Sequence, residues 1–458
     1  MLEHAPILEA TRSAAHTRAG ARIPAVFKRY RVFLGPAFLV SVGYVDPGNW
    51  GTDLQAGAQY RYGLLWVAAL SSVMAAVMQL LAARLGIVTG KSLAETCRDV
   101  YPAWCSVPLW IMCEIAIAAC DLAEVLGSAV AINLLFHVPL FPAVVMTAAD
   151  VLLLLLLQRH GMRLVERTVI VLVLTIAAAF FVELFMLSST RPDLGEVGQA
   201  LVHPALSGAS MTSVAVAIIG ATVMPHNLYL HSALVQNAPG GAQAMGASRK
   251  DSLRINGAAT IASLLLACLI NAAIVILAAM VFHGQSDIVV GGHRYLLEDG
   301  TDWIRLAYLT VAPALGSAVA SVVFATALLA SGQSSSITGT LAGQVVMEGF
   351  THWRISPWKR RAITRVMAIV PALLVIGPRG DAGVGDLLIL SQVVLALQLP
   401  FAMFPLLHVV TSRRRMGDLP TPGLLLALGW GSALVITAFE LVGLPSIAHD
   451  ASRTLFGS

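Results

Sequence analysis

The chain has 458 residues, of which 57% are hydrophobic and 12% are Asp, Glu, Lys or Arg. A soluble domain usually carries about 25% charged residues, so this composition, with a mean hydropathy of +0.79, excludes a soluble enzyme, a disordered chain and a disulfide scaffold. The five cysteines form no CxxC pair, which is typical of small packed apolar side chains rather than of a zinc site. The sequence predicts an integral membrane protein with many spans.

The predicted elements are helices. A helix that crosses a bilayer needs about 20 predominantly apolar residues, and the runs here are continuous, without the alternation that barrel strands require. We therefore expect an all-α membrane protein with eleven spans, at Val32–Gly57, Leu64–Ile87, Trp110–Leu135, Leu140–Leu157, Thr168–Leu187, Met211–Val235, Ala258–Val281, Val319–Val346, Ile363–Ile376, Leu387–Val410 and Leu424–Leu441.

The basic residues predict the orientation. If the N-terminus is cytoplasmic, 23 of the 29 Lys and Arg residues fall on the cytoplasmic side, as the positive-inside rule requires. The C-terminus is then extracytoplasmic. Residues 1–31 are too charged for the apolar region of a signal peptide, so we expect a cytoplasmic tail followed by one transmembrane domain, 32–458, in the cell membrane. The longest polar connections, 188–210 and 283–302, are expected to be loops.

Two of the spans contain helix-breaking residues at their centres. Span 1 contains Asp46-Pro47-Gly48-Asn49, and span 6 contains Met224-Pro225-His226. Proline removes a backbone donor and glycine adds backbone freedom, while an aspartate at the bilayer centre costs about 2.5–3.5 kcal/mol and indicates function. Broken helices at corresponding places in two halves point to the substrate site of an inverted-repeat transporter. The repeats would be about 32–187 and 211–410, and 424–441 would be an extra helix. The alternative is that the two breaks are proline kinks that bind no ligand.

The breaks offer ligands for a divalent cation. They supply the Asp46 carboxylate, the Asn49 amide oxygen, the Met224 thioether and freed carbonyls near Gly43 and Ala221. Carboxylate and carbonyl oxygens suit a divalent ion, and a soft sulfur shifts the preference from magnesium and calcium toward first-row transition metals. A methionine by itself more often fills a core; its place beside the break favours the metal.

Span 3 carries three carboxylates on one face. Glu114, Asp121 and Glu124 are separated by seven and three residues, which places them on one side of a helix. Such a row inside an apolar span indicates a proton relay or an ion path. The alternative, which is compatible with a relay, is structural pairing with the arginines that begin span 9, namely Arg360, Arg361 and Arg365. His226 and His231 do not share a face, so a metalloenzyme histidine pair is excluded; His226 is either a proton acceptor, a gate residue or a core histidine.

Together these motifs resemble the natural resistance-associated macrophage protein (NRAMP) family from about Phe33 to Leu441. The similarity also includes stretches elsewhere in the chain: Gln55–Ala58, Tyr229–Ser232, Ala330–Ser335 and Ser391-Gln392. Members of the family are proton-coupled divalent-metal transporters, and the bacterial ones transport manganese. The resemblance implies a LeuT-like fold, with two inverted five-helix repeats and broken helices 1 and 6.

The resemblance also implies roles for individual residues. The metal ligands would be Asp46, Asn49, Met224 and the Ala221 carbonyl, joined in some states by the Gly43 carbonyl and Gln392. The acidic residues and arginines would form the proton route, with His226 close to the metal; the residues that match are Glu114, Asp121, Glu124, Arg360 and Arg361. No permanently bound cofactor is implied, because Mn²⁺, related ions (Fe²⁺, Co²⁺, Cd²⁺) and protons are the transported species.

The sequence thus predicts an importer that works by alternating access and is not an enzyme. An amino-acid symporter of the same architecture is disfavoured because Asp46 would repel the substrate carboxylate, and Met224 argues against a magnesium-transporting relative. Paired broken helices disfavour a channel, which would need a repeated filter. The expected partners are divalent ions, protons and the bilayer, with no nucleic acid and no obligate protein; Arg413–Arg415 are expected to set orientation and contact lipid.

Overall fold

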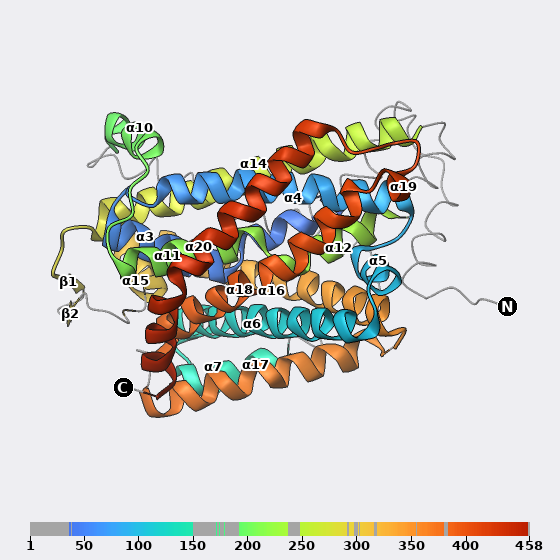
Figure 1. Ribbon diagram of the computed structural model, residues 1–458. Coiled ribbons are helices and arrows are strands. Elements are labelled where there is room, and N and C mark those ends of the chain that lie inside the picture. The colour runs from blue at the N-terminus through green and yellow to red at the C-terminus, as the bar shows by residue number, and fades with distance from the viewer. Residues whose placement is uncertain are drawn as a thin grey trace, which may run out of the picture.

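The computed structural model describes residues 36–37, 39–149, 171, 174, 178, 192–236, 248–290, 293–296, 301, 303–315, 318–353, 355–379 and 383–456. Long helices lie side by side in a bundle (Figure 1). Within these ranges, seven helices are long and apolar enough to cross a membrane. The prediction of an all-α integral membrane protein is confirmed.

Most predicted spans correspond to one helix each. Spans 2, 3, 7, 9, 10 and 11 are α4 (Leu65–Thr89), α6 (Ala103–Phe136), α14 (Arg249–Phe282), α17 (Pro357–Arg379), α18 (Gly383–Thr411) and α20 (Gly423–Phe456). Span 8 is α16 (Ala318–Thr351), which is 34 residues long and carries a polar serine-rich stretch. Each helix extends past at least one end of the apolar run that predicts it, because helices continue into the interfacial region.

Two predicted spans are only partly described. Span 4 begins with α7 (Leu140–Met146) and the 3-10 turn η2 (Thr147–Ala149), and its remainder lies outside the described residues. Nearly all of the span predicted at Thr168–Leu187 also lies outside them. The boundaries of the two repeats stay predictions.

Spans 1 and 6 are broken where the sequence predicts. In span 1 a 3-10 turn, η1 (Gly43–Val45), is followed by α3 (Pro47–Tyr60). In span 6, α11 (Ala209–Val223) is followed by α12 (Pro225–Gln236). Both breaks lie inside the bundle, where α3 packs on α14 and α6, and α11 packs on α18.

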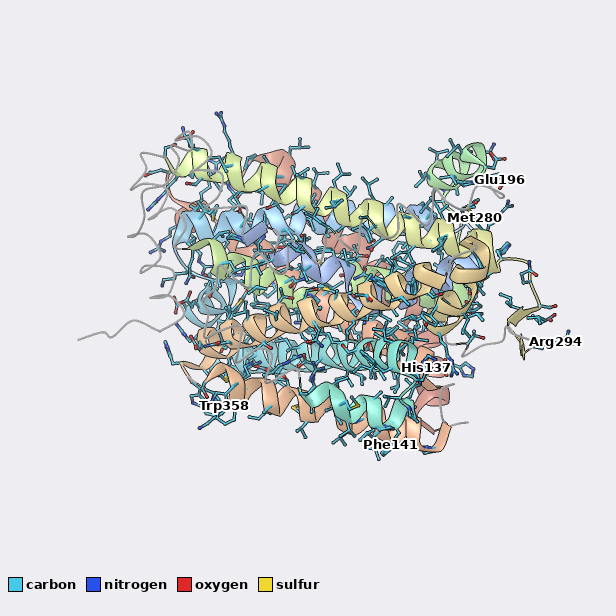
Figure 2. All side chains as sticks on the ribbon, turned by 180° about the vertical axis from the view of Figure 1, so that it is seen from behind. His137, Phe141, Glu196, Met280, Arg294 and Trp358 are labelled. Atoms are coloured by element: carbon cyan, nitrogen blue, oxygen red, sulfur yellow. The ribbon has the colours of Figure 1, made fainter. Side chains whose placement is uncertain are left out.

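The connections gather at two ends of the bundle. Figure 1 shows α5 (Leu93–Val100) and α19 (Arg413–Met416) at one end, and α10 (Leu194–Val202), α15 (Trp303–Leu315) and the hairpin of β1 (Asp287–Val290) and β2 (His293–Leu296) at the other. Figure 2 places Arg294, Glu196 and His137 at the hairpin end and Trp358 at the opposite one.

The prediction that 188–210 and 283–302 are plain loops is wrong in part. Asp193 caps α10 by accepting a 2.8 Å hydrogen bond from the Gly195 N–H, which supports a short helix. In the hairpin, Arg294 donates to Asp287 across the strands at 2.8 Å, and these bonds hold the pKa of the Asp287 carboxyl below its usual value. A hydropathy pattern does not reveal local polar contacts of this kind, so the sequence did not predict these two elements.

The outer surface of the bundle is apolar. Large side chains that are at least 40% exposed include Ile111, Leu265, Phe401 and Leu434, and Figure 2 shows Phe141 at the periphery. An apolar surface of this extent suits lipid rather than water. The polar residues at the two helix breaks are buried within the bundle.

Candidate metal site

The break in span 1 follows from Pro47. In a continuous helix the Gly43 carbonyl would accept from the N–H of residue 47, and proline has none. Asp46 leaves the helical conformation (φ −76°, ψ 168°) and caps α3, with its Oδ1 accepting from the Asn49 N–H at 2.7 Å. A buried carboxylate and a carbonyl that lacks its helical donor therefore lie together at the break.

The break in span 6 has the same origin. Pro225 lies four residues after Ala221, so the Ala221 carbonyl also loses its helical donor. Between the two half-helices Met224 adopts a left-handed backbone conformation, with φ 42° and ψ 99°. Such a conformation is strained for a residue other than glycine and often marks a functional site.

The two breaks meet at the side chain of Asn49. Its Nδ2 lies 2.8 Å from Asp46 Oδ1, 3.0 Å from the Ala221 oxygen and 3.3 Å from the Gly43 oxygen. Three of the predicted oxygen ligands thus converge on one point, although they come from segments that are more than 170 residues apart in sequence.

The orientation of the Asn49 amide differs from the prediction. The sequence predicts that the amide oxygen faces the ligands, whereas in the structure the nitrogen faces them and Oδ1 accepts from Asn271 Nδ2 at 3.3 Å. The reason is that three acceptor oxygens need a donor between them. A cation at this point would require the amide to turn, which would bring its oxygen into the same set.

Further polar atoms point at the breaks without partners. Among the described residues, Asp46 Oδ2, Gln392 Oε1 and Asn227 Oδ1 are buried and form no hydrogen bond. The Gln392 amide lies against the Cα of Gly48, since a Cβ on this glycine would overlap it. Buried oxygens normally have partners, so these three are available to a ligand.

The Met224 sulfur lies beside this oxygen cluster. A Cβ on Gly43 would come within 3.0 Å of the sulfur, and Asn227 Nδ2 approaches it at 3.3 Å. The side chain is fully buried and packs with Cys120 of α6 and Leu395 of α18. The predicted ligands Asp46, Ala221 and Met224 are therefore brought together with Gly43, Asn49 and Gln392.

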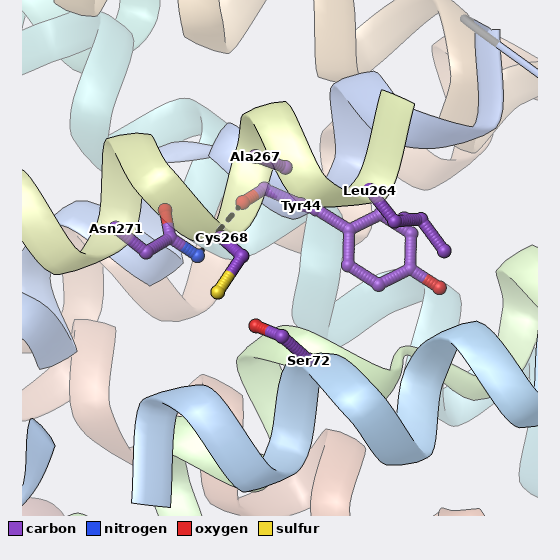
Figure 3. Close-up of a pocket in the computed structure, with 6 residues that line it drawn as sticks. All are labelled: Tyr44, Ser72, Leu264, Ala267, Cys268 and Asn271. Atoms are coloured by element: carbon purple, nitrogen blue, oxygen red, sulfur yellow. Dashed lines mark hydrogen bonds between the residues drawn. The ribbon is translucent and has the colours of Figure 1, made fainter. Parts of the chain in front are cut away.

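A crevice beside the site is closed by packing. Figure 3 shows Tyr44, Ser72, Cys268 and Asn271 around it, with Asn271 Nδ2 donating to the Tyr44 carbonyl at 3.1 Å. The crevice is too narrow to hold a water molecule. Asn271 thus ties η1 to α14 and holds the Asn49 amide at the same time.

The acidic face of α6 is paired with α17. Arg360 Nη2 lies 2.5 Å from Glu114 Oε2, and Arg361 lies 2.5 Å from Asp121 Oδ1 and 3.5 Å from Glu124 Oε2. Asp121, Glu124 and Arg361 are all at most 2% exposed in their side chains. The structural pairing that the sequence left open is present, and it is compatible with proton transfer.

Small residues of α16 make room for these charges. Ser335 and Ser336 donate to the two oxygens of Glu124 at 2.8 and 2.7 Å. A Cβ on Gly343 would overlap the Arg360 guanidinium. The small side chains of this face of α16 therefore accommodate the ion pairs between α6 and α17.

The two histidines of α12 have different surroundings. His231 Nδ1 lies 2.8 Å from Gln79 Oε1, and Gln79 Nε2 donates to the Tyr44 hydroxyl at 2.7 Å. His226 is 2% exposed, and within the described part of the chain its Nδ1 has no hydrogen-bond partner. Among the described residues His231 Nε2 also lacks a partner, so the role of His226 in proton exchange stays a prediction.

Several site residues were not found from the sequence. Asn271 is a lone polar residue near the middle of an apolar span, and Asn227 directly follows His226. Asp53 lies seven residues after Asp46 in α3, on the same helix face, is 1% exposed, and has an oxygen without a partner among the described residues. All three are polar residues inside predicted apolar spans, and this position could have identified them from the sequence.

Comparisons with known proteins agree with this geometry. A family model described as natural resistance-associated macrophage protein-like matches residues 37–445. The chain is 44% identical over 434 residues to the divalent metal cation transporter MntH of Mesorhizobium japonicum, covering 94% of this chain and 90% of that protein. It is 47% identical over 419 residues to MntH of Xylella fastidiosa, covering 91% and 85%.

Solved structures are similar over nearly the whole chain. A manganese transporter of Eremococcus coleocola superposes with a TM-score of 0.80 at 34% identity, covering 96% of this chain and 91% of that one. Mhp1, a nucleobase-cation-symport-1 family transporter, superposes with a TM-score of 0.56 at 14% identity, covering 93% and 95%. The likeness to Mhp1 shows the fold alone, and it confirms the predicted LeuT-like architecture.

A helical bundle in which two broken helices meet at a buried polar site is the architecture of a multi-pass membrane transporter. Within that class, the chain belongs to the natural resistance-associated macrophage protein-like family. The resemblance seen in the sequence is confirmed. The relatives are named as transporters, which agrees with the prediction that the protein is not an enzyme.

Proposed function

We propose that the protein imports manganese and related divalent transition metals across the cell membrane, coupled to protons, by alternating access. The observation that carries this proposal is the convergence of Asp46, Gly43 and Ala221 oxygens on one buried point beside the Met224 sulfur. The names of the relatives, divalent metal cation transporter and manganese transporter, support it.

Asp46 would supply the negative charge that holds the ion, and the Ala221 carbonyl and the Asn49 amide oxygen would complete the hard ligands. Met224 would add a soft ligand that favours transition metals over calcium and magnesium. The Gly43 carbonyl and Gln392 would join as the half-helices move. A carboxylated substrate would meet the Asp46 carboxylate and be repelled, so the amino-acid alternative stays disfavoured.

The proton route would run along α6. Glu114, Asp121 and Glu124 form a row of carboxylates with arginine partners, and Glu124 is the end nearest the metal site. Cys120 links the two, because it lies in one apolar cluster with Met224 and Leu395 and its Sγ lies 3.7 Å from Glu124 Oε1. Arg360 and Arg361 would hold the carboxylates in place, and His226 would exchange protons near the metal.

The proposed orientation places the N-terminus in the cytoplasm and the C-terminus outside. Its support is the gathering of basic connections at one end of the bundle, where α5 and α19 lie (Figure 1). The end of α20 lies at the opposite end of the bundle, the end that also carries α10 and the hairpin (Figure 1). Positive residues favour the cytoplasmic side.

The test is metal uptake by proteoliposomes under an imposed pH gradient. Manganese should enter faster when the external side is acidic, and cadmium, ferrous iron and cobalt should compete while calcium and magnesium do not. Absence of uptake with every divalent metal would overturn the proposed substrate. If metal uptake is the same with and without the pH gradient and moves no protons, the proposed proton coupling is wrong, while the proposed metal site is unaffected.

A further inference from the structure

A basic cavity lies away from the metal site, at the α5 and α19 end of the bundle. It has a volume of 320 Å³ and is lined by Val88, Arg249, Arg415, Met416, Gly417, Asp418 and Leu419. These residues come from the end of α4, the start of α14 and the connection between α18 and α20. The volume falls within the range of about 300–1,000 Å³ that is usual for small-ligand sites.

The walls of the cavity are held firmly by the fold. Arg84 Nη2 donates to the Leu419 and Pro420 carbonyls at 3.0 and 2.6 Å, and this ties the α18–α20 connection to α4. Met416 is 1% exposed and anchors α19 in the core. Ser248 caps α14 in a capping box with Asp251, which fixes the first turn that presents Arg249.

The charges of the lining favour an anion. The lining contains two guanidinium groups, those of Arg249 and Arg415, and one carboxylate, that of Asp418. Within the described part of the chain neither arginine forms an ion pair with a carboxylate. Guanidinium groups bind phosphate oxygens in a bidentate manner, so the lining carries an excess of one positive charge suited to a phosphodiester.

The position of the cavity favours a lipid as the source of that phosphate. It lies where three membrane-crossing helices, α4, α14 and α20, begin or end, which is the level of lipid headgroups. Val88, Met416 and Leu419 give it an apolar side beside the arginines. Basic pockets between spans on the cytoplasmic side are known to hold anionic headgroups.

We infer that this cavity binds the phosphodiester headgroup of an anionic phospholipid, such as phosphatidylglycerol, through Arg249 and Arg415. The site is independent of the proposed transport function. It assigns a role to part of the Arg413–Arg415 cluster, because only Arg415 lines the cavity, while Arg413 and Arg414 lie outside it.

The test is native mass spectrometry of the full chain released from nanodiscs of phosphatidylcholine with and without phosphatidylglycerol. The wild-type protein should retain phosphatidylglycerol in preference to phosphatidylcholine. Each arginine near a membrane surface contributes about fivefold in affinity, so Arg249→Gln/Arg415→Gln should weaken phosphatidylglycerol binding about thirtyfold. The matched control, Arg413→Gln/Arg414→Gln, removes the same charge and should bind nearly as the wild type does.

The inference would be overturned if both double variants lost phosphatidylglycerol binding equally. It would also be overturned if Arg249→Gln/Arg415→Gln lost none. Displacement of phosphatidylglycerol by inorganic phosphate would also overturn it, because the ligand would then be soluble phosphate. Arg249→Lys/Arg415→Lys keeps the charge and loses the planar fork, and an intermediate loss in this variant supports the bidentate contact. Thermal unfolding in phosphatidylcholine alone checks that each variant is folded.

Discussion

Two substitutions of Met224 distinguish the role of its sulfur as a metal ligand from the role of its side-chain volume in packing. The side chain is fully buried against Cys120 and Leu395. Met224→Leu keeps the volume and should cost less than about 1.5 kcal/mol of stability. Met224→Ala should cost about 2–5 kcal/mol and removes three heavy atoms, which leaves room for a water molecule of about 30 Å³.

Both variants should lose cadmium transport relative to manganese, because only the soft ion depends on the thioether. We expect at least a tenfold change in this ratio, which is about 1.4 kcal/mol of differential binding. Only Met224→Ala should become sensitive to calcium, since a water in the vacated position makes the ligands all oxygen. Leucine leaves no room for that water.

The assay is manganese and cadmium uptake by the three proteins in parallel, with and without excess calcium. Reconstituted amounts are matched by the folded fraction, so that the stability cost of the alanine does not enter the rates. If cadmium transport persists in both variants and calcium stays inert against Met224→Ala, then Met224 is not the selectivity ligand.

Three other substitutions test the charges. Asp46→Asn keeps the shape and removes the anion, so metal binding and uptake should collapse; near-normal uptake by correctly inserted protein would take Asp46 out of the site. Asp121→Asn breaks the 2.5 Å pair with Arg361 and should weaken acid stimulation of uptake while manganese binding stays measurable; an unchanged proton flux would leave Asp121 a structural role. Asp53 lies two helical turns, about 10 Å, beyond Asp46, so Asp53→Asn should raise the KM for manganese about fivefold with little change in maximal rate, and an unaltered KM would refute that contribution.

The backbone of the site could be predicted from the sequence because its cause is local. Pro47 and Pro225 each remove the donor for the carbonyl four residues earlier. The sequence therefore predicts that the oxygens of Gly43 and Ala221 are free to bind a ligand. The shared face of Glu114, Asp121 and Glu124 likewise follows from helical spacing alone, whichever helices pack on it.

The side-chain details could not be predicted, because they depend on segments far away in sequence. The Asn49 amide is held by Asn271, which is 222 residues away, so its rotation follows from packing rather than from the motif. The serine donors to Glu124 lie on α16, more than 200 residues beyond the carboxylate that they satisfy. Asp53 is the exception, because its spacing of seven residues from Asp46 is itself a local signal that places both on one helix face.

The proposed coupling of metal to proton would have a physical basis in the geometry of the site. Cys120 belongs to the same apolar cluster as Met224, and its Sγ lies 3.7 Å from Glu124 Oε1, so the metal site lies close to this end of the carboxylate row. Three carboxylates on α6 face three arginines of α17, which leaves the row neutral until a proton adds one positive charge. In the proposed cycle, a divalent ion arriving at Asp46 would repel that charge across a low-dielectric interior, where such interactions are strong. The proton would then be favoured to leave Glu124 and move along the row toward Asp121 and Glu114, away from the metal, and the two cations would share one conformational cycle without sharing one path.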